Sequence, residues 1–332
     1  MPKLAELPKL PSIRELEVNK FDEGVLRSIV KLTTLTYLRM CHISKLTCLL
    51  EGFFKNLTAL EDLRITYLGE LTTFSNEIGL QNIQCLQRLE ISGCPFLREL
   101  PQSLYKLSSL KELRVSKCPL LVSFPETGLP SKLIGLEIID CEALQFLPAW
   151  KMHNNVKASL LLEYLLIEGC SSLTSLPRGQ LPSSLKQLEI HYCMNLEFVP
   201  EQIIHNNNSL EIFKISWCHS VTFLEGTFGL STGTSSTIMN LKELIINNCT
   251  NLKSLPGGLH NHVYLDYLEI VECPLLQSFP EPDLPTLLRS IRISNCRSLK
   301  SLPNRMYRLT SLQVFCHFQR GVYRPIFCHF QS

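Results

Sequence analysis

Apolar residues recur along this chain in one spacing, which can be written L-x-x-L-x-[I/V]-x-x-C-x-x-L-x-x-[L/F]-P. Successive copies start about 24 residues apart, and a period of that length indicates a repeat array rather than two ordinary globular domains. Nine copies carry the cysteine, and they begin at Leu86, Leu110, Leu133, Leu162, Leu185, Leu210, Leu241, Leu265 and Leu288. Three earlier copies keep the apolar spacing without it, and they begin at Ile13, Leu35 and Leu60.

The first half of each copy alternates between apolar and polar residues. This alternation predicts a short strand whose leucine and isoleucine side chains face the core. One repeat buries too little apolar surface to fold alone, so we expect neighbouring repeats to stack and their strands to pair. The pattern therefore predicts one parallel sheet built from a strand of every repeat.

The connections between these strands contain prolines after the second apolar position of most copies. Proline lacks an N–H and fixes φ, so we expect turns and short 3₁₀ pieces there rather than long helices. The early repeats leave room for helices of one to three turns at Gly24–Lys31 and Glu51–Asn56. Two repeats are longer than the others, which predicts loop insertions at Trp150–Ser159 and Gly226–Thr237.

The template is similar to the leucine-rich repeat, in which the L-x-L segment forms the strand and the following cysteine or asparagine turns the chain. This resemblance implies an α/β solenoid of the leucine-rich-repeat type, a horseshoe with a parallel concave β-sheet. Its convex segments would be mostly irregular, short 3₁₀ or short helical. We assign an array of about twelve to thirteen repeats to residues 1–314 and a degenerate C-terminal tail to residues 315–332.

Fourteen cysteines allow three interpretations, namely a disulfide scaffold, a metal site and buried structural thiols. Nine of them occupy the same position of successive repeats, which favours small buried side chains whose thiols bond weakly to the backbone. Disulfides between neighbouring repeats remain a second interpretation. A zinc site in the tail, from Phe315–Gln319 and its exact duplicate Phe327–Gln331, is a third.

Composition argues against several function classes. The 32 Lys and Arg balance the 30 Asp and Glu, and they are spread along the chain, so we expect no nucleic-acid partner. No apolar run is long enough to cross a bilayer and no secretory signal opens the chain, so we expect a cytoplasmic protein without membrane contact. Phosphate loops, dinucleotide fingerprints, nucleophile elbows and metalloprotease motifs are absent, so we expect no enzyme, catalytic residue, metal or cofactor.

The outward-facing strand positions form the candidate site. Most carry charges, and neighbouring opposite charges such as Glu90 and Arg114 would form lateral pairs on a solvated face. The later repeats place apolar and aromatic side chains there instead, which is typical of a protein contact, with Trp217 as the best single anchor. The predicted protein-binding residues are Ile139, Tyr164, Leu166, Tyr192, Ile212, Trp217, Ile245, Tyr267 and Val271.

Segments such as Leu89–Pro95 and Leu268–Pro274, together with the trailing Leu-Pro, resemble the leucine-rich-repeat region of plant intracellular nucleotide-binding disease-resistance proteins of the coiled-coil class. The resemblance covers roughly residues 4–312. It implies a sensor that recognises a pathogen effector or a host protein and restrains a nucleotide-binding switch. The nucleotide-binding domain itself is not in this chain, so the chain is a fragment, a truncated paralogue or a stand-alone protein. The alternative is a leucine-rich-repeat adaptor such as the substrate-recruiting subunit of a ubiquitin ligase.

Overall fold

The computed structural model describes residues 7–8, 10–21, 24–49, 51–75, 79–147, 150, 160–176, 181–200, 203, 208–224, 240–279, 284–303 and 305–318. The chain divides into two compact units, Met1–Cys170 (unit 1) and Ser171–Ser332 (unit 2). Both predicted insertions fall outside the described residues except for Trp150, and so does the tail beyond residue 318.

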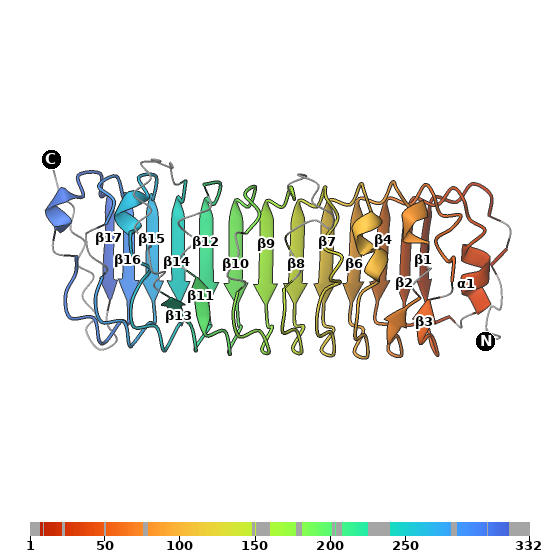
Figure 1. Cartoon of the computed structure of the whole chain (residues 1–332), viewed down its shortest axis with the longest axis horizontal. Helices are drawn as coiled ribbons and strands as arrows, with labels where there is room; N and C mark the ends of the chain where they lie inside the picture. Colours follow the sequence, from red (N-terminus) through yellow and green to blue (C-terminus); the bar gives the residue numbers. More distant parts are fainter. Residues whose placement is uncertain are drawn as a thin grey trace. The chain divides into compact units, whose positions relative to one another are not determined.

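Unit 1 contains a parallel sheet whose strands follow one another in chain order (Figure 1). They are β1 (Glu15–Asn19), β2 (Tyr37–Cys41), β4 (Asp62–Thr66), β6 (Arg88–Ser92), β7 (Glu112–Ser116), β8 (Gly135–Ile139) and β9 (Tyr164–Glu168). The connections contain α1 (Gly24–Ile29), the 3₁₀ turns η1 (Leu80–Asn82) and η2 (Gln102–Lys106), and the short pair β3 (Cys48–Leu49) and β5 (Thr73–Phe74).

Unit 2 repeats the arrangement. Its parallel strands are β10 (Gln187–His191), β12 (Ile212–Ser216), β14 (Glu243–Asn247), β15 (Tyr267–Val271), β16 (Ser290–Ser294) and β17 (Val314–Phe318). The connections contain the 3₁₀ turns η3 (Leu259–Asn261) and η4 (Met306–Arg308) and the short pair β11 (Phe198–Pro200) and β13 (Thr222–Leu224). Strand β17 pairs with β16 and takes residues 315–318, the start of the sequence-assigned tail, into the sheet.

Strand pairing within each unit has no offset between repeats. Leu89 of β6 pairs with Leu113 of β7, and Ile91 pairs with Val115, so each apolar position stacks on its equivalent in the next repeat. These side chains are buried, which confirms the predicted alternation. Because each buried aliphatic side chain contributes roughly 1.5–3 kcal/mol, the columns hold neighbouring repeats together.

Short connecting segments agree with the prediction that proline excludes long helices. The helix expected near Gly24–Lys31 is present as α1. The helix expected at Glu51–Asn56 is wrong, because residues 51–56 form turns. Gly52 has a φ of 65°, in the left-handed region, and this backbone cannot continue a right-handed helix.

In the large parallel sheet of each unit, every strand from β1 to β16 is followed by a residue in the left-handed backbone region, a feature that the sequence pattern did not predict. The φ angles range from 50° to 66° at Lys20, His42, Tyr67, Gly93, Lys117, Asp140, Gly169, Tyr192, Trp217, Asn248, Glu272 and Asn295. Only two of these are glycines, and in other residue types this conformation costs roughly 1–2 kcal/mol. We call this residue the turn residue.

Backbone hydrogen bonds offset part of the free-energy cost of the left-handed conformation. The turn residue donates its backbone N–H to the carbonyl that ends the next strand, as from Tyr67 to Ser92 at 2.8 Å and from Trp217 to Asn247 at 2.9 Å. The bend also reverses the strand alternation. Strict alternation would direct Lys117 inward and Cys118 outward, but Lys117 is exposed and Cys118 is buried.

The bend thereby buries the predicted column of thiols. All nine repeat cysteines are buried thiols outside any disulfide, and the thiol donates to the carbonyl two residues earlier, as in Cys118 to Ser116 at 3.4 Å. Burial raises the pKa of Cys141 above its ordinary value and that of Cys296 to about 11, so both thiols stay protonated at neutral pH. This geometry agrees with the prediction of buried structural thiols.

Lys117 tests the energetic cost of the turn residue, because its side chain is exposed. We expect Lys117→Asn to raise the free energy of unfolding by about 0.5 kcal/mol, since asparagine tolerates the left-handed region. We expect Lys117→Val to lower it by roughly 1–2 kcal/mol, since β-branched side chains are strained there. Urea unfolding measures both. Lys132→Asn, at an exposed position outside the left-handed region, is the control, and equal effects of the two Lys117 substitutions would contradict the assignment.

Candidate functional site

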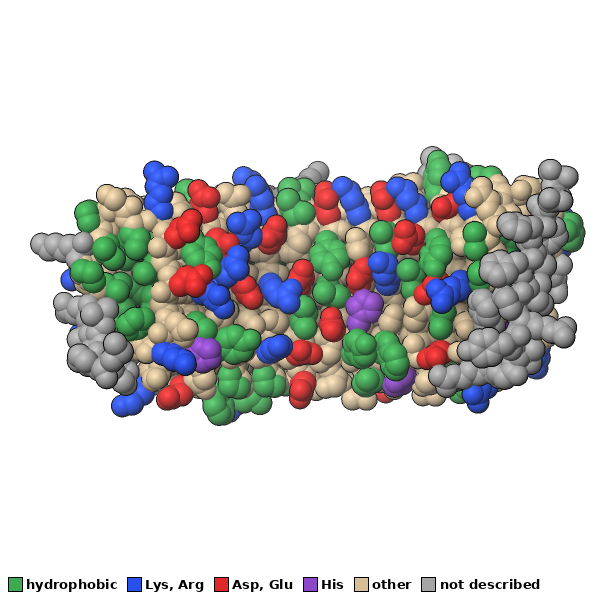
Figure 2. All heavy atoms as spheres, turned by 180° about the vertical axis from the view of Figure 1, so that it is seen from behind, with side chains coloured by type: hydrophobic (Ala, Val, Ile, Leu, Met, Phe, Trp, Pro, Cys, Tyr) green, Lys and Arg blue, Asp and Glu red, His purple; other side chains and the backbone are tan. Residues whose placement is uncertain are grey.

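The open face is formed by the first, third and fifth residues of the strands of each large sheet, together with the turn residues that follow them, and these side chains point away from the core. Figure 2 shows a face of the molecule on which charged side chains of both signs alternate with apolar ones. The burial pattern of the strands assigns the same alternation, as in β12, where Phe213 and Ile215 are buried and their neighbours are partly exposed. The open face is therefore the surface on which the sequence-predicted residues are found.

Unit 1 contains three of the predicted residues. Tyr164 and Leu166 occupy the first and third positions of β9, and Ile139 ends β8. All three are half-buried. They lie on the open face, but most of its other positions in this unit carry charges.

Unit 2 contains the other six. Ile212, Ile245, Tyr267 and Val271 occupy outward positions of β12, β14 and β15 and are half-buried. Tyr192 and Trp217 are more exposed, at 44% and 39%. These two are turn residues, so the left-handed backbone is what directs their side chains outward.

The structure brings Tyr192 and Trp217 together. Their rings stack with centroids 5.8 Å apart and planes 12° from parallel, and the rings of Trp217 and His219 lie edge-to-face with centroids 6.1 Å apart. The remaining predicted residues are interleaved with polar side chains. Ile245 is paired across the strands with Lys214 and Glu269 rather than with another apolar residue.

Glu189 is the centre of one polar cluster on the open face of unit 2. Its carboxylate accepts hydrogen bonds from Lys214 Nζ at 3.0 Å and from Gln187 Nε2 at 2.6 Å, and it lies 3.3 Å from His191 Nε2. Desolvation by burial pushes the pKa of Glu189 up, but these hydrogen bonds outweigh it and lower the pKa below its ordinary value. The cluster therefore stabilises the charged carboxylate.

A second cluster surrounds Glu269. Asn247 Nδ2 donates to this carboxylate at 2.8 Å, the Tyr267 hydroxyl donates at 2.5 Å, and Arg292 lies 3.5 Å away. Burial and the hydrogen bond to Glu269 raise the pKa of Tyr267 to about 12, so its hydroxyl remains a donor. Tyr267 is therefore fixed by a hydrogen bond at its tip and presents its ring to solvent less freely than Trp217 does.

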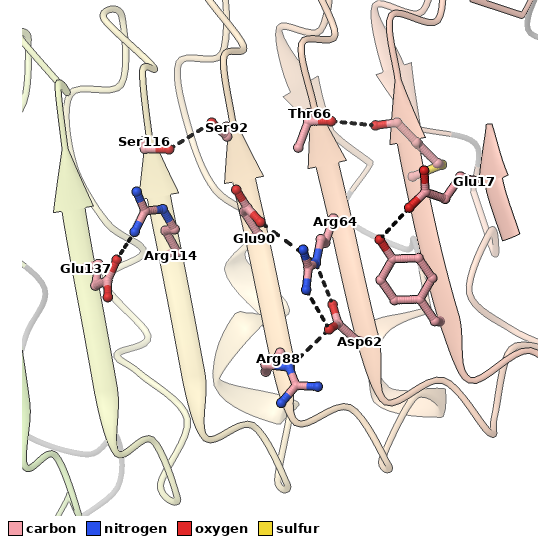
Figure 3. A network of polar contacts seen from close by, with 12 residues as sticks. Glu17, Asp62, Arg64, Thr66, Arg88, Glu90, Ser92, Arg114, Ser116 and Glu137 are labelled. Atoms are coloured by element: carbon pink, nitrogen blue, oxygen red, sulfur yellow. Dashed lines mark hydrogen bonds and ion pairs between the residues drawn. The ribbon is translucent and has the colours of Figure 1, made fainter. Parts of the chain in front are cut away.

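Unit 1 carries an extended network of ion pairs that sequence reasoning missed (Figure 3). Asp62 is buried at 6% exposure and accepts two hydrogen bonds from Arg64 at 3.2 Å and one from Arg88 at 3.0 Å. The Arg64 guanidinium also lies 5.4 Å from the ring centre of Tyr37, whose hydroxyl donates to Glu17. Hydrogen bonding to Asp62 raises the pKa of Arg64. The network is thus charge-paired rather than a row of independent solvated side chains.

The expected lateral pair of Glu90 with Arg114 is wrong. Arg114 forms its ion pair with Glu137 on the following strand, and Glu90 lies 3.9 Å from Arg64 on the preceding one. Each side chain had an opposite charge on both neighbouring strands, because the third positions read Arg64, Glu90, Arg114 and Glu137. The side-chain rotamers decide whether Arg114 pairs with Glu90 or with Glu137, and the sequence does not specify these rotamers.

Metal and membrane sites were also sought. Within the described ranges, no three His, Cys, Asp or Glu side chains converge on a common point, and no helix is long and apolar enough to span a bilayer. Cys316 and His317 of the tail alternative lie in β17, but Cys328 and His329 fall outside the described residues.

The lowered pKa of Glu189 predicts a pH dependence. A carboxylate with a depressed folded pKa stabilises the fold above its unfolded pKa, which is about 4.3, and loses that contribution as pH falls. We expect Glu189→Gln to lower the free energy of unfolding by roughly 1–2 kcal/mol at pH 7 and the deficit to shrink between pH 5 and 3. Urea unfolding at several pH values measures it. Glu243→Gln on β14 is the control, and a deficit independent of pH would contradict the assigned interaction.

Comparisons with known proteins agree with this geometry. The family model of the Leucine Rich Repeat matches residues 85–107. Protein SUPPRESSOR OF npr1-1, CONSTITUTIVE 1 from Arabidopsis thaliana is 30% identical over 60% of this chain, and the match covers 14% of that protein. Putative disease resistance protein At3g14460 from the same plant is 36% identical over 55% of this chain and 12% of its own length. The chain therefore spans about an eighth of the length of these relatives.

Among solved structures, the leucine-rich repeat domain of the type III effector XopL superposes with a TM-score of 0.54. It is 22% identical and covers 77% of this chain and 76% of that domain, so it supports the fold alone. The predicted leucine-rich-repeat fold and the resemblance to disease-resistance proteins are confirmed. The chain is a leucine-rich-repeat solenoid whose sequence relatives include plant disease-resistance proteins.

Proposed function

We propose that this chain is a non-enzymatic protein-recognition module of plant innate immunity. It binds a pathogen effector, or a host protein that an effector alters, through its open face. In a longer receptor, such binding would release a nucleotide-binding switch that the repeats restrain. The relatives motivate the biological setting, since they are named as disease-resistance proteins. The chain acts in the cytoplasm under this proposal.

The observation that carries the proposal is the exposed stack of Tyr192 on Trp217. Tryptophan and tyrosine are the residues most enriched at the energetic centres of protein interfaces, because each buries a large area and loses little side-chain freedom. The stack and the turn backbone hold both rings before any partner arrives. Their left-handed backbone is shared by other repeats, so it is the pairing of a tyrosine with a tryptophan at successive turn positions that distinguishes this part of the face.

The charges of the open face favour a protein partner over nucleic acid. Basic side chains on the face, such as Arg64, Arg114 and Lys214, already pair with carboxylates of neighbouring strands. A nucleic-acid surface instead requires a stripe of uncompensated Lys and Arg to displace counterions. A partner that buries the aromatic stack and borders on paired charges has the usual layout of a protein interface, an apolar centre with a polar rim. The proposed contact surface consists of the nine residues predicted from the sequence, with this stack as its anchor.

Trp217→Ala tests the anchor. We expect it to weaken binding of the recognised protein by about 30-fold, since removing a buried aromatic anchor costs about 2 kcal/mol or more. Purified effectors and host proteins that bind the unmodified chain in a two-hybrid screen would be measured by calorimetry. Tyr307→Ala removes a more exposed tyrosine from η4, outside the strands, and should leave affinity unchanged. Equal affinity of the Trp217→Ala variant and the unmodified chain would remove the stack from the site.

The receptor setting has a separate test. Genomic and transcript sequence upstream of Met1 would be searched for an in-frame phosphate loop. Finding one supports the switch-receptor proposal. An in-frame F-box segment in its place would instead favour the ubiquitin-ligase adaptor.

A further inference from the structure

A pocket of about 480 Å³ opens on the open face of unit 1, over strands β4 to β9. Gly135 lines it at the first position of β8, where the neighbouring strands carry Glu112 and Tyr164. A Cβ added at Gly135 would meet no atom within 4 Å. Its φ is not in the left-handed region, so the backbone does not require glycine here. A glycine within a strand weakens the strand, and one of its uses is to admit another molecule close to the backbone.

The strand register defines the walls of this slot. Gly135 pairs directly with Glu112 on one side and with Tyr164 on the other. Since neighbouring strands are about 4.8 Å apart, these two side chains rise from backbones roughly 10 Å apart. A gap of that width accommodates one extended side chain between a carboxylate and an aromatic ring.

In the described part of the chain, most charged side chains around the slot already have an ion-pair or hydrogen-bond partner, and Glu112 is the exception. Arg114 is paired with Glu137, Arg88 is turned to Asp62, and Lys111 Nζ donates to Gln87 Oε1 at 3.0 Å. Glu112 is exposed, and among the described residues no cation or hydrogen-bond donor contacts its carboxylate. Glu112 therefore presents an unpaired carboxylate to the slot, although the pocket as a whole contains as many cations as anions.

We propose that the slot over Gly135 receives an arginine or lysine side chain of the protein partner. The Glu112 carboxylate pairs with the cation, and the face of Tyr164 packs against the same group or its methylene chain. An acidic side chain of the partner would be repelled by Glu112. The neighbouring Arg88 and Arg114 already form ion pairs, so they would not offset this repulsion. This assignment rests on the proposed function only in that the open face binds a protein, and it adds the chemistry of the side chain recognised.

The test needs no identified partner. The full chain, labelled with ¹⁵N, is titrated with a blocked Gly-Arg-Gly tripeptide, with the lysine analogue, and with the same peptide carrying citrulline, the neutral isostere of arginine. We expect the Gly135 amide resonance to move with arginine or lysine at millimolar peptide and citrulline to bind at least five-fold more weakly. Because salt screens a charge contact at an exposed surface, raising the salt concentration should also weaken binding of the arginine peptide.

Substitutions localise the site. Glu112→Gln should weaken binding of the arginine peptide at least five-fold. Gly135→Leu, which fills the slot, should abolish binding, read in this variant from the amide resonances of residue 135 and of its neighbour Leu136 in β8. Glu15→Gln changes an exposed carboxylate at the equivalent position of β1, outside the pocket, and should have no effect. Equal binding of citrulline, unchanged binding by Glu112→Gln, or no shift with arginine would each overturn the proposal. Loss of partner binding in Trp217→Ala is measured separately, so the slot and the aromatic anchor can fail independently.

Discussion

The hydrogen bond that a turn residue donates to the end of the next strand is the interaction on which the rest of each sheet depends. It joins one repeat to the next beyond the last strand residue, and it requires a left-handed backbone. That backbone brings the following cysteine into the core and sends the turn side chain to the surface. A strand that kept its alternation would expose the thiol and bury Lys117 or Trp217.

This constraint explains why the turn position tolerates so many residue types. Lysine, tyrosine, tryptophan, aspartate and glutamate all occupy it, because the side chain points outward and only the backbone is specified. Each pays a local cost that the leucine columns and the ladder hydrogen bonds offset. Because the strands pair without offset, turn residues of neighbouring repeats lie next to each other. Tyr192 therefore stacks on Trp217, and His42 stacks on Tyr67 with ring centroids 5.2 Å apart.

The open face combines two kinds of surface that serve recognition differently. Ion pairs between neighbouring strands, such as Asp62 with Arg64 and Arg88, hold side chains in defined positions but contribute little net attraction to a partner. The exposed aromatic stack provides apolar area, and the slot at Gly135 provides the carboxylate of Glu112. Under the proposed function, the stack would contribute affinity and the slot would select the residue type.

The sequence by itself determined the repeat, the strands, the buried thiols and the lack of long helices, because these follow from spacing and proline chemistry that each repeat contains locally. The outward direction of seven of the nine candidate residues could also be assigned from the strand pattern, whereas that of Tyr192 and Trp217 depends on the left-handed turn. Tertiary structure decided the rest. Whether Arg114 pairs with Glu90 or Glu137, whether Asp62 binds two arginines, and whether Glu112 is left unpaired depend on competing rotamers across strands that are distant in the chain. The left-handed turn likewise arises from a hydrogen bond between repeats, which no single repeat can reveal.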